Sequence, residues 1–259
     1  MVEGPLAPER KVTFLGGATI DGAPIPYVVV LAAVVTALSF VPFSIALGGG
    51  TAFPLAQVVY PLCGILLGPI AGAVAAGIGA GIGIFVAPHT AGTMPIETVI
   101  VVMAGAFAAG AIVRGPERTK WWMPPVFLAL ANFIASSLFA VLVVGVEFRI
   151  LLASMVTVIV AFALWLLPTR KLFARWVGSK KLVLVFLGTA FITLLGYTVS
   201  TNIGIGYFIN PWPNEVWAML IPIIPVENLF RMIVGAIIGT GIIVGLRAIG
   251  LVKAKWATY

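Results

Sequence analysis

The chain has 259 residues, of which 61% are hydrophobic and 9% are charged, and its mean hydropathy is +1.18. Because soluble globular chains average about 25% charged residues, this composition excludes a soluble domain and predicts a membrane protein. The net charge of +7 follows the expected membrane topology, so no nucleic-acid partner is expected. The single cysteine, Cys63, excludes an intramolecular disulfide and a cysteine-based metal site.

Read in order, the chain predicts an all-α polytopic bundle of about eight transmembrane helices. Residues 1–26 lack an apolar run beside a basic start, so they are expected to be a polar cytoplasmic leader and not a signal peptide. Residues 27–250 form a single transmembrane domain, and 251–259 form a cytoplasmic tail. The expected spans are 27–47, 53–67, 68–87, 98–113, 124–145, 150–167, 182–200 and 227–246. The second is shorter than the roughly 20 residues of a full crossing and carries prolines, so it is expected to be tilted or partly re-entrant.

Small residues recur at every fourth position on both sides of the Gly68–Pro69 step. In water each helical glycine costs about 1 kcal/mol relative to alanine, but in a bilayer small residues at this spacing let helices approach closely. The sequence therefore predicts a sharp turn at Gly68–Pro69 within a helix-packing stripe. The members of the stripe are Gly64, Gly68, Gly72, Ala73, Gly77 and Gly81.

The basic residues predict the orientation. Of 15 Lys and Arg residues, only Arg149 and Arg231 fall outside one side of this topology. The positive-inside rule then places both termini in the cytoplasm of a multi-pass protein of the cell membrane.

Recognisable catalytic motifs are absent from the sequence. The one histidine, His89, falls in a loop, the one aspartate, Asp21, falls in the leader, and neither HExxH nor a Walker A motif occurs. We therefore expect no enzymatic activity, no metal site and no cofactor, and any use of ATP has to come from a partner.

Residues 202–231 concentrate aromatic and amide side chains, among them Tyr207, Asn210, Trp212 and Asn228. One interpretation is an interfacial aromatic belt, because Trp and Tyr favour the headgroup region. The other is a lid over a pocket, in which aromatic faces hold a flat ligand and amides give directional hydrogen bonds.

Three further features each have two interpretations. Glu227 and Arg231 share a helix face, either as a charge pair where the last span begins or as a site for a carboxylate or phosphate. Glu97 lies at the start of another span on the same outer side, and it could take part in binding such a ligand in a similar way. The AxxxA step of Ala33 and Ala37 is either ordinary packing or a smooth face for a partner protein.

Several segments, in this order, resemble the substrate-binding S-component of energy-coupling-factor (ECF) vitamin transporters. They are GILLGPIAGAVAAGIGAGIG, PIETVIVVMAGAFAAGAIVRG and IPVENLFRMIVGAIIGTGI. The Gly-Pro-x-x-Gly step at 68–72, the Ala-Gly-x-x-x-x-Gly step at 104–110 and Pro225-x-x-Asn228 carry the resemblance, which covers 28–115 and 222–250.

The resemblance implies a capture subunit for a vitamin-like ligand, with a six-helix core and an extra hairpin at 124–167. Ala33 and Ala37 would dock on a transmembrane coupling protein that two ATPases drive. The ligand pocket would open on the outer side, and the candidates for its lining are Glu97, Tyr207, Asn210, Trp212, Glu227, Asn228 and Arg231.

Two other functions remain open from the residues themselves. One is a non-catalytic structural or accessory subunit of a larger membrane complex; the other, a secondary transporter, is disfavoured because the spans hold almost no ionisable groups. A closed polar pocket beneath 200–225 would favour capture, whereas side chains filling that space would favour an accessory subunit.

Overall fold

The structure is a computed structural model, and it describes residues 17–45, 52–91, 94–113, 120–168, 171–172, 176 and 207–249. Five helices in this part of the chain are long and apolar enough to cross a membrane. The chain is therefore a multi-pass helical membrane protein. The span expected at 182–200 and the tail at 251–259 lie outside the described residues, as does most of the leader.

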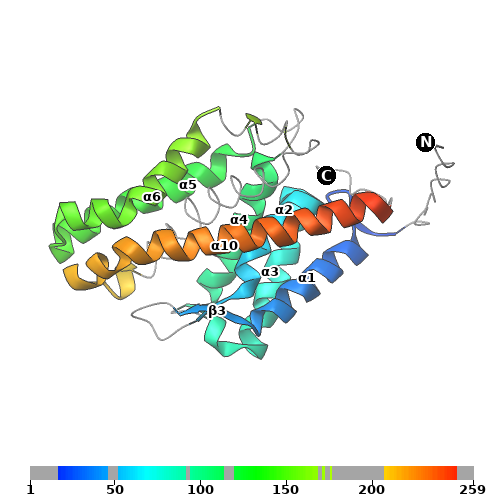
Figure 1. The fold of residues 1–259 in the computed structure, drawn as a ribbon, viewed down its shortest axis with the longest axis horizontal. Helices are drawn as coiled ribbons and strands as arrows, with labels where there is room; N and C mark the ends of the chain where they lie inside the picture. The colour runs from blue at the N-terminus through cyan, green and yellow to red at the C-terminus, as the bar shows by residue number, and fades with distance from the viewer. Residues whose placement is uncertain are drawn as a thin grey trace, which may run out of the picture.

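The first half of the chain forms a compact block of four helices with short accessory elements (Figure 1). Within the block α3 packs against α1 and α4, and α2 packs between α3 and α4. In chain order the elements are β1 (Thr19–Ile20), β2 (Ala23–Pro24), α1 (Ile25–Ser39), β3 (Pro42–Ile45), β4 (Ala52–Pro54), η1 (Leu55–Val58), α2 (Tyr60–Leu67), α3 (Pro69–Val86), η2 (Pro88–Thr90) and α4 (Pro95–Ile112). Both strand pairs, β1–β2 and β3–β4, are antiparallel.

The expectation of a helical span over 27–47 was wrong in its second half. Helix α1 ends at Ser39, and the chain then forms the hairpin β3–β4. Pro42 explains the stop, because proline has no amide donor and disfavours helical geometry in the residue before it.

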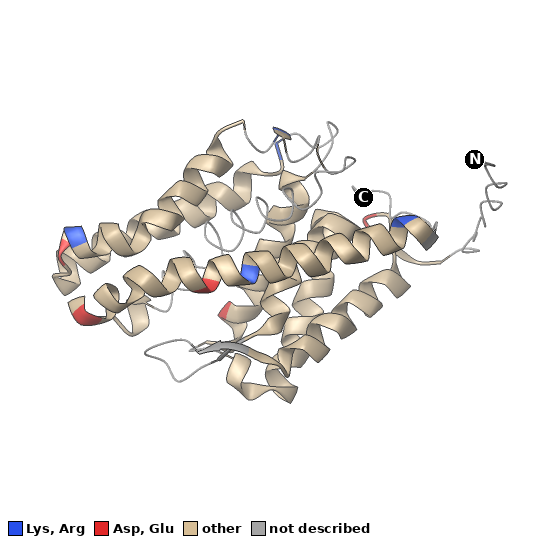
Figure 2. Cartoon of the chain, viewed as in Figure 1, with Lys and Arg blue, Asp and Glu red and all other residues tan. Residues whose placement is uncertain are grey.

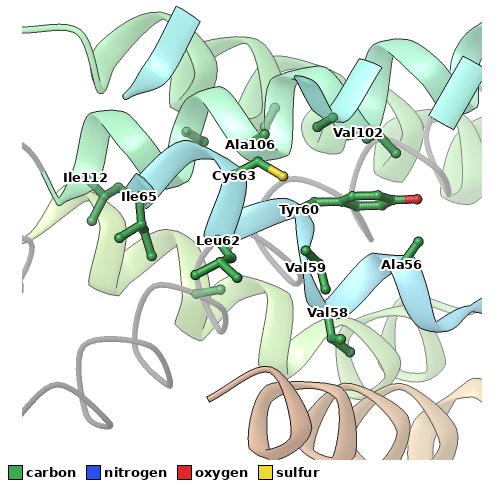
Figure 3. Packing of buried hydrophobic residues seen from close by; sticks show 14 of the residues in the cluster. Ala56, Val58, Val59, Tyr60, Leu62, Cys63, Ile65, Val102, Ala106 and Ile112 are labelled. Atoms are coloured by element: carbon green, nitrogen blue, oxygen red, sulfur yellow. The ribbon is translucent and has the colours of Figure 1, made fainter. Parts of the chain in front are cut away.

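The short return over 53–67 is divided into the 3-10 turn η1 and the helix α2, a division that the sequence pattern did not predict. Every residue of α2 is buried inside the block, so the eight-residue helix is part of the core. Figure 3 shows its side chains packed among those of α4, with Cys63 beside Ala106 and Ile65 near Ile112.

The turn at Gly68–Pro69 is confirmed. Gly68 has φ 88° and ψ 173°, a region that is essentially restricted to glycine, and it separates α2 from α3. Pro69 then occupies the first turn of α3, where its missing amide proton leaves no hydrogen bond unmade.

Glycines bring the backbones of the block into direct contact. A Cβ at Gly64 would overlap the carbonyl oxygen of Ala106, and one at Gly110 would lie 2.8 Å from the carbonyl oxygen of Gly64. The packing role expected of Gly64 and Gly72 is thereby confirmed, since Gly72 faces the backbone of α2 in the same way. Gly81 differs, because no described atom lies within 4 Å of the Cβ it lacks.

The described part of the second half of the chain adds a helical hairpin and a long helix. The hairpin consists of α5 (Met123–Phe139), the π-helical turn η4 (Ala140–Val144) and α6 (Phe148–Leu166). It confirms the pair of spans expected at 124–145 and 150–167. Figure 1 shows α6 and α10 starting at the same end of the molecule and separating towards the other end.

Helix α10 (Asn214–Ile249) is much longer than expected. Its 36 residues include Pro222 and Pro225, so the last helix begins 13 residues before the predicted start at 227. The predicted loop over 201–226 is therefore helical from Asn214 onward. Pro222 and Pro225 do not end the helix, because apolar surroundings favour helical backbone and proline is tolerated in membrane helices.

Candidate functional site

Three of the charged and amide side chains of α10 form a row midway along the helix, the polar row Glu227–Asn228–Arg231. Arg231 is 4% exposed and Asn228 3% exposed, whereas Glu227 retains 21% exposure. One Nη of Arg231 donates to Oε2 of Glu227 at 3.0 Å, and the other donates to Oδ1 of Asn228 at 3.3 Å. The Asn228 amide donates in turn to the carbonyl oxygen of Ile224 at 2.8 Å. The arginine is therefore oriented from two sides within its own helix.

The polar row lies in the middle of α10 and not at its beginning. Arg231 is the 18th of the 36 residues, with about 26 Å of helix on either side at 1.5 Å per residue. A crossing needs about 20 residues, and every stretch of that length within α10 contains Arg231. Figure 2 shows a red and a blue segment next to each other midway along α10.

A 20-residue crossing centred on Arg231 places the pair at mid-depth, and one that begins at 230 places it at the membrane edge, so both interpretations of the charge pair stay open. A pair at the start of a span would sit in the headgroup region, where charge is inexpensive. An arginine near the bilayer centre costs about 2.5–3.5 kcal/mol on the insertion scale, and ionisable groups at that depth generally mark substrate or ion pathways. Chemically, the guanidinium fork suits a planar carboxylate or a phosphate, while Glu227 keeps the row close to neutral.

A second group of candidate residues forms an aromatic cluster at the N-terminal end of α10. We define the aromatic cluster as Tyr207, Trp212 and Trp217 with Phe139 of α5. Tyr207 and Trp217 are 0% and 2% exposed, and their rings meet edge to face with centroids 5.2 Å apart. Trp212 packs on both, and the Phe139 ring meets Tyr207 edge to face at 5.9 Å.

The polar atoms of the aromatic cluster bond to one another. Trp217 Nε1 donates to the Tyr207 hydroxyl at 3.2 Å, and that hydroxyl donates to the carbonyl oxygen of Trp212 at 3.1 Å. Burial raises the pKa of Tyr207, and the hydrogen bond from Trp217 partly offsets that rise. The side chains of the aromatic cluster therefore pack against one another and satisfy their own polar atoms. This arrangement is typical of structural packing more than of a lid over a ligand.

The predicted lining residues fall into separate groups. Trp217 and Arg231 are 14 residues apart on α10, which corresponds to about 21 Å of helix rise, so the aromatic cluster and the polar row do not form one small pocket. Asn210 is exposed beside the cluster. Glu97 is 7% exposed in the first turn of α4, where an acidic side chain complements the helix dipole.

A shallow hollow of about 250 Å³ opens at the end of the molecule where the α5–α6 turn meets α10. Its lining residues are Val144, Gly145, Val146, Pro211, Pro213, Asn214 and Glu215. Asn214 Oδ1 accepts the backbone amide of Glu147 at 2.9 Å and thereby ties the start of α10 to this turn. The hollow lies beside the aromatic cluster, and none of the seven predicted lining residues contributes to it.

Ala33 and Ala37 are both exposed on α1. The opposite face of α1, with Val35 and Ser39, packs on Gly79 and Gly83 of α3. Of the two interpretations of the AxxxA step, the exposure favours the smooth face for a partner over packing within the described bundle.

Sequence reasoning missed several residues that organise this region. Trp217 was expected in a loop but lies on α10 and donates the hydrogen bond to Tyr207; Asn214 was not expected to act as a tie. The Ile224 carbonyl was also missed, although an asparagine four residues after a carbonyl on a helix is a recognisable signal. In the described part of the chain, no three His, Cys, Asp or Glu side chains gather to hold a metal ion.

No known protein family, curated protein or solved structure matches this chain.

Proposed function

We propose that the chain is the membrane-embedded capture subunit of an ATP-driven uptake transporter of the ECF type, binding a vitamin-like small molecule. The observation that carries the proposal is the polar row, with Arg231 buried midway along an apolar helix and oriented by Asn228 and Glu227. Because a buried arginine is costly in a bilayer, a function that uses its hydrogen-bonding capacity explains its presence better than packing does.

The partners in this proposal are a transmembrane coupling protein and ATPase subunits. The exposed pair Ala33 and Ala37 supports the proposal, because small exposed residues at this spacing let a partner helix approach closely. We also propose that both termini are cytoplasmic. Figure 1 supports a common side, since α1 begins and α10 ends at the same end of the molecule.

An accessory subunit of a larger membrane complex is the second candidate. The aromatic cluster favours it, because Tyr207, Trp212 and Trp217 fill the space beneath their segment and satisfy their own polar atoms. In that case the polar row would only lock α10, and the exposed face of α1 would be a permanent interface.

Ligand capture is tested by purifying the protein in lipid nanodiscs and identifying co-purifying small molecules by mass spectrometry. The variant Arg231→Lys keeps the positive charge beside Glu227 but loses the fork, so we expect at least a tenfold loss of affinity for the recovered ligand. Arg149→Lys is the matched control, because Arg149 is exposed beside the α5–α6 turn and should bind as the wild type does. Absence of a ligand, or equal binding by both variants, would exclude capture at this row.

Partner binding is tested separately by a pull-down in mild detergent. Recovery of a coupling protein and ATPases that Ala33→Trp releases, while the small molecule stays bound, supports the transporter. The control Ile82→Trp places the same side chain at an exposed position of α3 and should keep the partners. A stable complex without ATPases or a small molecule would support the accessory subunit.

A further inference from the structure

We infer that α10 contains a hinge at Pro222–Pro225, about which the hairpin α5–α6 with the aromatic cluster moves relative to the block α1–α4. This inference goes beyond the proposed function and does not depend on it, since it concerns how two parts of the fold are joined. It rests on the backbone chemistry of α10 and on the different neighbours of its two ends.

The two prolines each remove one backbone hydrogen bond from α10. Neither has an amide proton, so the carbonyls of Ala218 and Ile221, four residues earlier, receive no bond from them. Pro222 and Pro225 are three residues apart, which is less than one turn of 3.6 residues. Both missing hydrogen bonds therefore fall within one turn of the helix. Sharp helix bends in proteins occur mostly at proline, so this turn is the most compliant part of α10.

Residues before the hinge are tied to the hairpin. Asn214 accepts the backbone amide of Glu147 in the α5–α6 turn, and Trp217 bonds to Tyr207. Tyr207 packs edge to face on Phe139, the last residue of α5. Side-chain hydrogen bonds and ring contacts thus join the first turns of α10 to the hairpin as one unit.

Residues after the hinge are tied to the block. A Cβ at Gly235 would lie 3.0 Å from the carbonyl oxygen of Val58, so α10 and η1 meet backbone against backbone. Figure 3 shows Val58 pointing from η1 towards α10. Arg231 and Asn228 lock the turns between the hinge and this contact.

Direct packing between the two units is limited in the described part of the chain. The hairpin meets the block chiefly where α5 follows α4, while its other main neighbour is α10 itself. Figure 1 shows α6 diverging from α10 towards the end of α10 that packs on the block. A bend at Pro222–Pro225 would therefore move the aromatic cluster relative to the polar row. The contacts within the hairpin unit and those within the block would stay intact.

The test measures distances between spin labels by double electron–electron resonance in nanodiscs. Leu142→Cys on the hairpin and Phe85→Cys on α3 form the pair across the hinge, since these side chains are 75% and 86% exposed. Two pairs within units serve as references: Leu142→Cys with Met219→Cys, and Phe85→Cys with Ile237→Cys. The native Cys63 is 0% exposed and stays unlabelled.

We expect the distance distribution across the hinge to be about twice as wide as either reference distribution, as for hinged units. Pro222→Ala combined with Pro225→Ala restores both amide donors and should narrow the distribution across the hinge to the width of the references. Pro124→Ala is the matched control, because that proline lies in the first turn of α5, where no helical bond is missing, and it should leave all widths unchanged.

Equal widths for all three pairs in the wild type would overturn the hinge, and this comparison does not depend on any proline variant folding. A broad distribution across the hinge that persists in the double variant would also overturn it. Equal ligand binding by Arg231→Lys and Arg149→Lys, together with the expected widths, would count against the proposed function alone.

Discussion

Substitution of Gly64 by alanine tests the backbone contact between α2 and α4. The new Cβ would overlap the carbonyl oxygen of Ala106 and lie 2.7 Å from the amide nitrogen of Gly110. Both neighbours are backbone atoms, so no side-chain rotation relieves the overlap and the helices have to move apart. Overpacking a core costs about 1–3 kcal/mol, and we expect the upper end, about 3 kcal/mol of unfolding free energy.

Gly81→Ala is the matched control on α3. No described atom lies within 4 Å of its added methyl group, and alanine gains up to about 1 kcal/mol of helix propensity over glycine. The two variants should therefore differ by about 3–4 kcal/mol, although both are glycine-to-alanine changes of the same predicted stripe. Gly77→Ala should fall between them, because it meets the flexible side chain of Met103.

The assay is reversible unfolding in bicelles, with stability read from steric trapping or from denaturant titration. A difference below about 0.5 kcal/mol between Gly64→Ala and Gly81→Ala would refute the reasoning, since surface substitutions fall in that range. Equal losses of unfolding free energy for Gly77→Ala and Gly64→Ala would also refute it. They would show that a backbone neighbour moves aside for the new methyl group as easily as the Met103 side chain does.

Four other predictions concern α10, Tyr207 and the turn before α3. Arg231→Met should destabilise by about 3 kcal/mol because it leaves the Glu227 carboxylate without its ion pair, whereas adding Glu227→Met should restore most of the loss in the same unfolding assay. Trp217→Phe removes the hydrogen bond that lowers the pKa of Tyr207, so that pKa should rise further in an ultraviolet titration; no rise would exclude the bond. Stability should fall as the pH rises above 10.0, the ordinary pKa of tyrosine, because the folded state retains the proton more strongly. Gly68→Ala should cost about 1–3 kcal/mol from its φ of 88°, and an unchanged unfolding midpoint would contradict that backbone geometry.

The fold could be predicted from sequence where local chemistry dominates. Low charge and long apolar runs required a membrane protein, and the Gly68–Pro69 step required a turn because glycine and proline constrain the backbone directly. The spans corresponding to α3, α4 and the hairpin α5–α6 were predicted for the same reason. The boundaries of α1 and α10 were not, because the same residue type, proline, ends α1 before Pro42 and is accommodated within α10 at Pro222.

The candidate site could be predicted only in part. The spacing of Glu227 and Arg231 was sufficient to pair them, because residues four apart meet on any helix. Their place midway along the helix was not predictable, since it depends on where α10 begins. The ligand, the partners and the roles of Asn210 and Glu97 stay predictions.

The sequence by itself determined three things: the chain enters a membrane, it turns at Gly68, and α10 carries a charge pair. Each of them follows from composition or from residues a few positions apart. Only the tertiary structure decided that Gly64 meets a backbone while Gly81 does not, that Tyr207 bonds to Trp217, and that Arg231 is buried. Each of these depends on which helix face a distant segment covers. Small residues at every fourth position do not show which of them another helix will contact.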